Sequence, residues 1–213
     1  MHFLSEDLEQ YIAKHSEPEP PLLQELSRET HLKVIQARMI TGHFQGRVLS
    51  MLSHIIAPKR ILEIGTYTGY SALCLAEGLV SNGSLHTIEV NPELAHIQKK
   101  YFEKSDYSKQ IHTYLGNALD IIPQFEQPFD LVFIDAEKKQ YDAYFEAVLK
   151  VSKPGTVILS DNVLWTGKVV APLAPKDKTT QALLEYNKKL ATDPRVQTSL
   201  LPIRDGLTMS RVL

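Results

Sequence analysis

The sequence lacks the features that mark several large classes of protein. It has one cysteine, Cys74, which excludes a disulfide scaffold and disfavours a zinc site built on thiolates. Its apolar runs reach four or five residues, far short of the roughly 20 that a membrane-spanning helix needs. Lysine and arginine total 23 against 25 aspartate and glutamate, so no basic excess points to a nucleic-acid partner.

The first residues also lack the pattern of a secretory signal, because Glu6 and Asp7 are acidic where such a signal would be basic and then apolar. We therefore expect a cytoplasmic protein that binds no membrane. The length of 213 residues and the hydrophobic fraction of 43% predict one globular domain over residues 1–213. We divide it into an N-terminal helix and proline-rich joint (1–21), a helical cap (22–58) and an α/β core (59–213).

Apolar strand patterns and helical patterns alternate along the core. The strands are continuous apolar runs, which is typical of a parallel sheet covered by helices on both faces. Pro154 and Gly155 predict a turn, and Arg204-Asp205-Gly206 predicts a hairpin between the last two strands. The expected strands are 60–64, 85–90, 112–115, 129–135, 156–160, 196–203 and 207–213, and the expected helices include 4–14, 43–56 and 71–80. The predicted fold class is α/β.

The unusual residues follow the ends of the predicted strands, where α/β sheets bind ligands. Gly65 and Gly69 flank a short turn before a helix, and this helix start with Ser71 suits an anionic group, although a plain tight turn explains the glycines equally well. Glu89 ends the second strand and is either a ribose ligand or a surface residue. Asn117 follows the third strand and either reads an adenine edge or caps a helix.

Oxygen-bearing side chains follow the next two strands. Asp135 ends one strand, and Asp161 and Asn162 end the other. If these strands are neighbours, the three groups form a set that suits Mg²⁺, Ca²⁺ or Mn²⁺ rather than zinc, whereas an isolated aspartate there would be a helix cap. Lys138 is either a general base beside such a cation or a surface lysine, and Trp165 is either a pocket wall or part of the core.

Three segments together resemble the cation-dependent, S-adenosylmethionine-dependent O-methyltransferases, which include catechol O-methyltransferase and the caffeoyl-CoA O-methyltransferases. The segments are Glu-Ile-Gly-Thr-Tyr-Thr-Gly-Tyr-Ser-Ala from residue 63, Ile-Asp-Ala-Glu-Lys from residue 134 and Asp-Asn-Val-Leu-Trp from residue 161. The resemblance extends from about Met39 to Leu207. It implies a Rossmann-like class I methyltransferase fold with a seven-stranded, mostly parallel sheet, an antiparallel last strand and helices on both faces.

The resemblance also implies roles for individual residues. Lys138 would be the catalytic base, and Met39 and Trp165 would line the substrate pocket. Asp135, Asp161 and Asn162 would hold a divalent cation, with Mg²⁺ as the first expectation and Ca²⁺ or Mn²⁺ as alternatives. The residues that would bind S-adenosyl-L-methionine are Met39, Glu63, Gly65, Tyr67, Gly69, Tyr70, Ser71, Glu89, Val90, Gly116, Asn117, Ala118, Asp135 and Tyr144.

The implied substrate is a small aromatic molecule with two adjacent hydroxyl groups, and the implied assembly is a homodimer. Residues 41–47 depart from the Glu-Gly-Gln pattern of the family, which puts cofactor contacts from that helix in doubt, and Glu137 stands where an aromatic residue would stack on adenine.

The glycine spacing disfavours a dehydrogenase. Asp135-Ala136-Glu137-Lys138 differs from the Asn/Asp-Pro-Pro-aromatic pattern of many enzymes that methylate nucleic-acid bases or protein amines. A methyltransferase with a non-catechol acceptor and a non-catalytic nucleotide-binding domain stay open.

Overall fold

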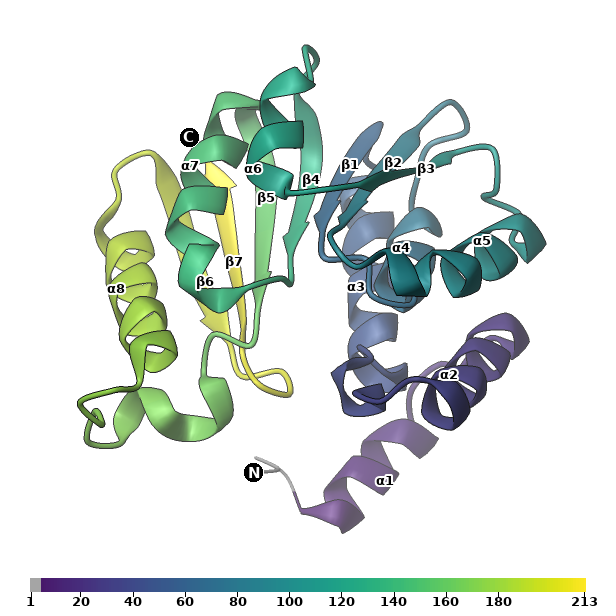
Figure 1. Ribbon diagram of the computed structural model, residues 1–213, viewed down its shortest axis with the longest axis horizontal. Helices are drawn as coiled ribbons and strands as arrows, with labels where there is room; N and C mark the ends of the chain where they lie inside the picture. The colour runs from purple at the N-terminus through teal and green to yellow at the C-terminus, as the bar shows by residue number, and fades with distance from the viewer. Residues whose placement is uncertain (1–4) are drawn as a thin grey trace.

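The computed structural model describes residues 5–213, except for the Glu6 side chain, and its centre is a seven-stranded sheet with helices on both faces (Figure 1). The strands are β1 Arg60–Ile64, β2 Ser84–Glu89, β3 Ile111–Leu115, β4 Phe129–Ile134, β5 Ser152–Asp161, β6 Val196–Leu201 and β7 Leu207–Val212. The α-helices are α1 Glu6–Lys14, α2 Pro21–Lys33, α3 His43–Ile56, α4 Tyr70–Ala76, α5 Ala95–Lys104, α6 Ala118–Ile121, α7 Tyr141–Lys150 and α8 Lys178–Thr192. The 3₁₀ helices are η1 Ala37–Met39, η2 Pro92–Leu94, η3 Ile122–Gln124, η4 Lys138–Gln140 and η5 Trp165–Val170.

The strand order is β3-β2-β1-β4-β5-β7-β6. Strands β1 to β5 pair in parallel, and β7 is antiparallel to both β5 and β6. The predicted mostly parallel sheet with a reversed last strand is therefore confirmed. Because β1 pairs with both β2 and β4, the strand order reverses there, and this is where a ligand crevice is expected at the carboxyl ends of the strands.

Successive side chains of a strand point to opposite faces of the sheet. Helices cover both faces, so each central strand is buried on both sides. Ile61, Leu85 and Leu131 pack toward the helices α2 to α5. Leu62 and Val132 pack toward α6, α7 and α8, which cover the other face (Figure 1). The two cores explain why the strands read as continuous apolar runs.

The predicted helix over 71–80 is too long. The helix α4 ends at Ala76, and Gly78 then passes directly against the end of α3. A Cβ atom at Gly78 would lie 2.2 Å from the carbonyl carbon of Ser53, so only glycine fits at this contact. The close approach holds α3 against the core.

The predicted turn at Pro154 and Gly155 is wrong, because both residues lie within β5. The pairing of β4 with β5 shifts register between Phe129 and Leu131, and Gly155 has a φ of +93°. These residues form a bulge inside the strand. A bulge, like a turn, can accommodate the positive φ of a glycine.

At the N-terminus the predicted helix over 4–14 is confirmed from Glu6 onward, whereas Leu4 lies outside the described residues. Ser5 caps this helix, since its side chain accepts a hydrogen bond from the Leu8 N–H at 3.4 Å. None of the helices in the described part of the chain is long and apolar enough to cross a membrane.

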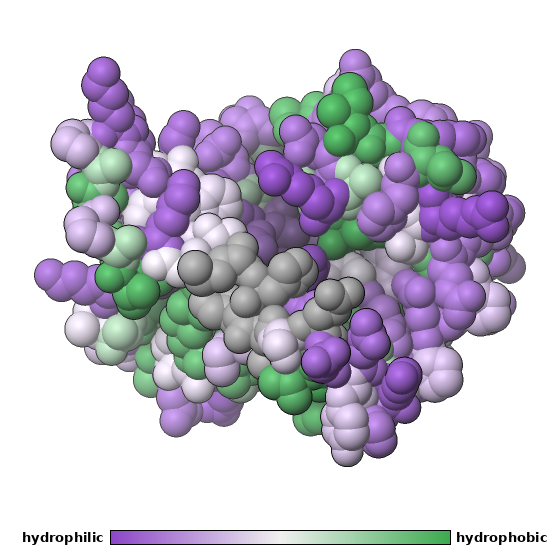
Figure 2. All heavy atoms as spheres, turned by 90° about the horizontal axis from the view of Figure 1, so that it is seen from below, coloured by the Kyte–Doolittle hydropathy of each residue, from purple (hydrophilic) through white to green (hydrophobic). Residues whose placement is uncertain are grey.

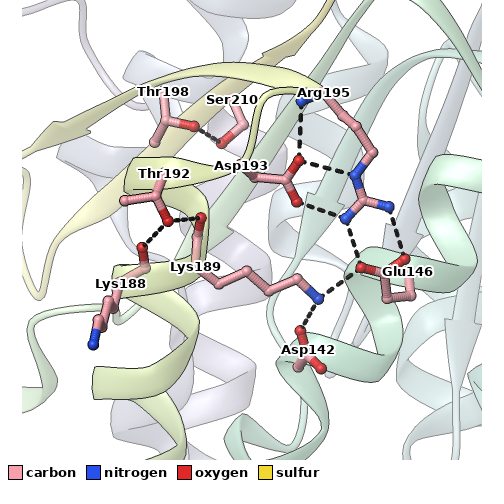
Figure 3. A network of polar contacts seen from close by, with 9 residues as sticks. All are labelled: Asp142, Glu146, Lys188, Lys189, Thr192, Asp193, Arg195, Thr198 and Ser210. Atoms are coloured by element: carbon pink, nitrogen blue, oxygen red, sulfur yellow. Dashed lines mark hydrogen bonds and ion pairs between the residues drawn. The ribbon is translucent and has the colours of Figure 1, made fainter.

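Charged residues join the helix layer to the start of β6 (Figure 3). Arg195 donates to the carboxylates of Glu146 on α7 and Asp193, and Lys189 on α8 pairs with Glu146 at 2.6 Å. The positive charges hold the pKa values of Glu146 and Asp193 at about 2. The network links α7 and α8 to the residues directly before β6.

We expect Gly78→Ala to destabilise the protein by about 1–3 kcal/mol, because its methyl group would collide with the backbone of α3. Thermal unfolding followed by circular dichroism would show one transition at a lower midpoint. Ser81→Ala is the matched control, since Ser81 is exposed in the same connection, and it should leave the midpoint unchanged. An unchanged midpoint for Gly78→Ala would show that the two helices are not in the close contact described above.

Candidate active site

The carboxyl ends of β1 and β4 meet without space for a side chain between them. Gly65 has a φ of +99°, and a Cβ atom there would lie 2.0 Å from the main-chain oxygen of Asp135. Glycine is therefore required both by the backbone conformation and by the contact. This approach places the glycine turn next to the first of the predicted metal ligands.

A small pocket opens at this edge of the sheet. Six residues predicted to bind the cofactor are in its lining, so the fold brings together residues from the cap, the glycine turn and β4. Viewed from below Figure 1, this side of the molecule is largely hydrophilic and hollowed near its middle (Figure 2). The lining residues are Met39, Ile40, Thr41, Gly65, Thr66, Tyr67, Tyr70, Ser71 and Asp135.

Glu63 lies beneath this pocket with no exposed surface. Thr87 donates a hydrogen bond to its Oε2 at 2.5 Å, and its Oε1 has no partner among the described residues. Burial raises the pKa of Glu63 to about 8, and the negative charges of Asp135 and Glu89 add to this effect. The carboxyl group thus holds its proton at neutral pH unless a cationic partner is bound.

Glu89 connects the glycine turn to the end of β2. Its Oε2 accepts from the Tyr67 N–H at 2.7 Å, and its Oε1 accepts from the Val90 and Asn91 N–H groups at 2.9 Å each. Tyr67 has a φ of +49°, and the hydrogen bond that its N–H donates to Glu89 holds this strained conformation. The role of Glu89 toward a ribose stays a prediction, while its role in shaping the turn is visible.

The other predicted cofactor residues lie outside the lining of this pocket. Gly69 instead packs on Phe102, since a Cβ atom there would lie 2.7 Å from the ring. Asn117 caps α6 by accepting from the Leu119 N–H at 3.1 Å, so the capping interpretation is confirmed and the adenine contact stays a prediction. The remaining four differ in exposure: Val90 is exposed, Gly116 is half-buried, and Ala118 and Tyr144 are buried in the second core.

Lys138 is buried, so its interpretation as a surface lysine is wrong. Its Nζ donates to Asp135 Oδ1 at 2.7 Å and to the Tyr141 hydroxyl oxygen at 2.8 Å. The Tyr141 hydroxyl in turn donates to the main-chain oxygen of Asp161 at 2.9 Å. Burial, with the charges of both aspartates, raises the pKa of Tyr141 well above its usual value, so the group is a neutral hydroxyl that orients the ammonium.

The predicted metal ligands come together because β4 and β5 are neighbours. Ile134 pairs with Ser160, which places Asp135 and Asp161 side by side. Burial raises the pKa of Asp161, and the charge of Asp135 raises it further. Asn162, at a φ of +59°, donates its N–H to Asp161 Oδ1 at 2.7 Å.

The buried carboxylate of Asp161, the half-buried carboxylate of Asp135 and the amide of the next residue, Asn162, have the donor chemistry of a site for a hard divalent cation. No group of three or more histidine, cysteine, aspartate or glutamate side chains within residues 5–213 is arranged to hold a metal ion. A cation at this site would therefore depend on Asn162 and water in addition to the two acids. The donor set fits such an ion by its chemistry.

Comparison with known proteins agrees with this arrangement. A family model described as O-methyltransferase matches residues 13–213. The chain belongs to the O-methyltransferase family. It is 37% identical over 220 residues to caffeoyl-CoA O-methyltransferase 2 of Eucalyptus globulus, covering 97% of this chain and 89% of the relative.

A second relative of the enzyme is a catechol O-methyltransferase of Niastella koreensis, 36% identical over 177 residues, which cover 79% of this chain and 80% of the relative. Among solved structures, an O-methyltransferase from Bacillus cereus in complex with SAH superposes with a TM-score of 0.90. It is 33% identical, and the match covers 97% of each chain. The fold of this O-methyltransferase is accordingly the Rossmann-like class I methyltransferase fold that the sequence predicts.

The sequence did not identify two residues that complete the site of the O-methyltransferase. Tyr141 was not among the predicted site residues, although its spacing of three residues from Lys138 is a usable signal. Gln45 on α3 is fully buried, and its amide lowers the pKa of Asp161. Gln45 lies within the segment that departs from the family pattern and far before Asp161 in the sequence, so nothing local in the sequence points to its effect on that carboxyl group.

Trp165 is half-buried at the start of η5 and packs against the second core. The core interpretation therefore describes part of its surroundings, and its role as a pocket wall stays a prediction, since Trp165 is not in the lining of the pocket described above. Met39 at the end of η1 is 58% exposed and lies in the pocket lining. The structure thus leaves Met39 accessible to a ligand, whereas Trp165 presents only part of its surface.

Proposed function

We propose that this O-methyltransferase transfers a methyl group from S-adenosylmethionine to a hydroxyl of a small catechol-like molecule with the help of a divalent cation. The observation that carries this proposal is the buried Lys138 ammonium beside Asp135 and Asp161, at the edge of the pocket. A basic residue next to two acids supplies both a proton acceptor and a cation site in one place. The names of the caffeoyl-CoA and catechol relatives support the choice of acceptor.

The pocket residues support S-adenosylmethionine as the methyl donor, as does the SAH in the name of the Bacillus cereus structure. The unpartnered Oε1 of Glu63 suits the ammonium group of the methionine part, because that group would satisfy the buried oxygen and favour its charged form. Gly65, Tyr67 and Ser71 would surround this part. Glu89 would bind the ribose, and Asn117 with its neighbours the adenine.

Asp135, Asp161 and Asn162 would hold the cation, with Mg²⁺ as the first expectation. When bound, the cation would favour ionisation of an acceptor hydroxyl, and S-adenosylmethionine would supply the methyl group. Lys138 would take the hydroxyl proton at Nζ in its neutral amine form, which a cation held beside it by Asp135 would favour over the ammonium, and its contacts with Asp135 and Tyr141 would position Nζ. Alignment of this kind contributes roughly 7–11 kcal/mol to comparable reactions.

The pKa of Glu63 predicts how the affinity for S-adenosylmethionine varies with pH. An ammonium partner favours the ionised carboxylate, so binding should release a proton below about pH 8 and strengthen as the pH rises toward that value. Calorimetry of S-adenosylmethionine binding in two buffers with different ionisation enthalpies measures this release. Glu63→Gln should abolish the proton release, and release that persists in the variant would assign it to another group.

The decisive experiment is methyl transfer from S-adenosylmethionine to caffeic acid, protocatechuic aldehyde and a catecholic flavonoid, with Mg²⁺ and with EDTA. We expect transfer that EDTA abolishes. Transfer that is equal in EDTA would contradict the cation, and cofactor binding without transfer to any catechol would favour the non-catechol acceptor. The absence of cofactor binding would favour a binding domain without this chemistry.

The same assay tests whether Asp161 acts as a metal ligand or whether removal of any aspartate lowers the activity. Asp161→Ala should lose the Mg²⁺-dependent turnover and keep its affinity for S-adenosylmethionine, because Asp161 is not in the pocket lining. Asp120→Ala is the matched control, since Asp120 is an exposed aspartate on α6. Full activity of Asp161→Ala would remove this residue from the ligand set.

We also propose that the three segments form one domain of a cytoplasmic homodimer. The cap is tied to the core, for example by Lys104 on α5, which donates to Glu25 on α2 at 2.7 Å. Apolar side chains remain exposed on the neighbouring helices α1 and α3, including Tyr11, Met51 and Ile55.

Light scattering at micromolar concentration should give the mass of a dimer, and Ile55→Lys should shift it toward the monomer if α3 contributes to the interface. A stable monomer in the unaltered protein would exclude the dimer. The single thermal transition expected for the Gly78→Ala experiment also checks the one-domain proposal, since two transitions would contradict it.

A further inference from the structure

The turn between β6 and β7 contacts the cap on one side of the site. Arg204, at the tip of this turn, donates through Nη1 to the main-chain oxygens of Thr41 and Ile40, the latter at 3.3 Å. The same nitrogen donates to Gln45 Oε1 at 3.2 Å. Thr41 and Ile40 line the pocket directly after Met39, so Arg204 holds the chain on this side of the pocket.

The same turn contacts the segment that carries Trp165 on the other side. The main-chain oxygen of Asp205 accepts from the Leu164 N–H at 2.9 Å, and its Oδ1 accepts from the Thr166 N–H at 2.5 Å. Gly206 has a φ of +86°, and a Cβ atom there would lie 2.4 Å from Leu164 Cγ. These contacts hold both neighbours of Trp165 against the turn.

The backbone around Trp165 has strained conformations that these contacts stabilise. Trp165 and Thr166 have φ values of +47° and +53°, and Arg204 in the turn has +48°. These left-handed conformations are unfavourable for residues other than glycine and persist where the surrounding structure holds them. Asp205 is the residue that supplies two of these restraints.

We infer that Arg204 and Asp205 are positioning residues that fix the separation between the Met39 segment and the Trp165 segment, the two segments proposed to contact the acceptor. This inference rests on the proposed function for its assignment of the pocket. Neither residue touches a reacting atom in the arrangement described. Each acts through the segment that it holds, Arg204 through residues 40–45 and Asp205 through residues 164–166.

The kinetic test compares Arg204→Ala, Arg204→Gln and Arg204→Lys with Arg211→Ala, an exposed arginine of the same hairpin. Loss of the charged hydrogen bonds should raise KM for caffeic acid about tenfold and reduce the preference for it over the bulkier flavonoid, with a smaller change in kcat. Arg204→Lys should recover part of the loss, and Arg211→Ala should behave like the unaltered enzyme. The dissociation constant for S-adenosylmethionine should change less than the KM for caffeic acid, because Arg204 contacts only the Ile40 and Thr41 side of the pocket, whereas Gly65, Tyr67 and Ser71 are held independently of it.

The spectroscopic test does not require turnover. Trp165 is the only tryptophan of the chain, so its fluorescence reports on this segment alone when excited at 295 nm. Asp205→Ala should raise the acrylamide quenching constant about twofold, because loss of the acceptor frees the Thr166 N–H and the strained backbone relaxes. Asp205→Asn keeps an acceptor oxygen and should give a value close to that of the unaltered protein.

An unchanged KM and acceptor preference in both Arg204→Ala and Arg204→Gln would overturn the role of Arg204. Equal weakening of acceptor and S-adenosylmethionine binding would overturn it as well, since it would indicate general loosening. Unchanged quenching in Asp205→Ala would overturn the role of Asp205. If the unaltered protein methylates no catechol, the proposed acceptor fails, whereas the quenching result still decides whether Asp205 holds Trp165.

Discussion

The register between β4 and β5 is the constraint on which the rest of the site depends. Because Ile134 pairs with Ser160 in parallel strands, the chain must place Asp135 and Asp161 next to each other at the buried edge of the sheet. Two adjacent carboxylates repel each other, and burial increases the cost of their charges. The surrounding structure therefore has to supply positive charge or hydrogen-bond donors, and Lys138 is the nearest source of both.

The acids of the site meet this demand in different ways. Asp135 pairs with an ammonium, Glu89 accepts only backbone N–H groups, and Glu63 retains a proton. The same edge can thus carry several acids without a large excess of buried negative charge. Each arrangement differs in what it leaves available, since Lys138 is held in place by its hydrogen bonds, the Glu89 carboxylate is oriented by backbone N–H groups, and the protonated Glu63 can become charged beside a cationic group.

The sequence predicted the parts of the enzyme that depend on local patterns. The apolar strands, the glycine turn and the terminal hairpin were recognised because composition and spacing within a few residues determine them. The contacts of Gln45 and Arg204 could not be predicted, because they join segments about 160 residues apart and depend on the order of strands in the sheet. The prediction of a turn at Gly155 was wrong for a related reason. Pairing with β4 keeps this residue in a strand, and a bulge accommodates its positive φ.

The position of β7 has a consequence for how the enzyme is made. Residues 207–212 form the strand that the ribosome synthesises last among the seven, but this strand lies between β5 and β6 rather than at an edge. A nascent chain that has reached only residue 201 exposes the open edge of β5, and β6 has no strand to pair with. The loop that carries Trp165 cannot receive its restraints before Asp205 leaves the exit tunnel, so this loop becomes fixed only when synthesis of the sheet is nearly complete.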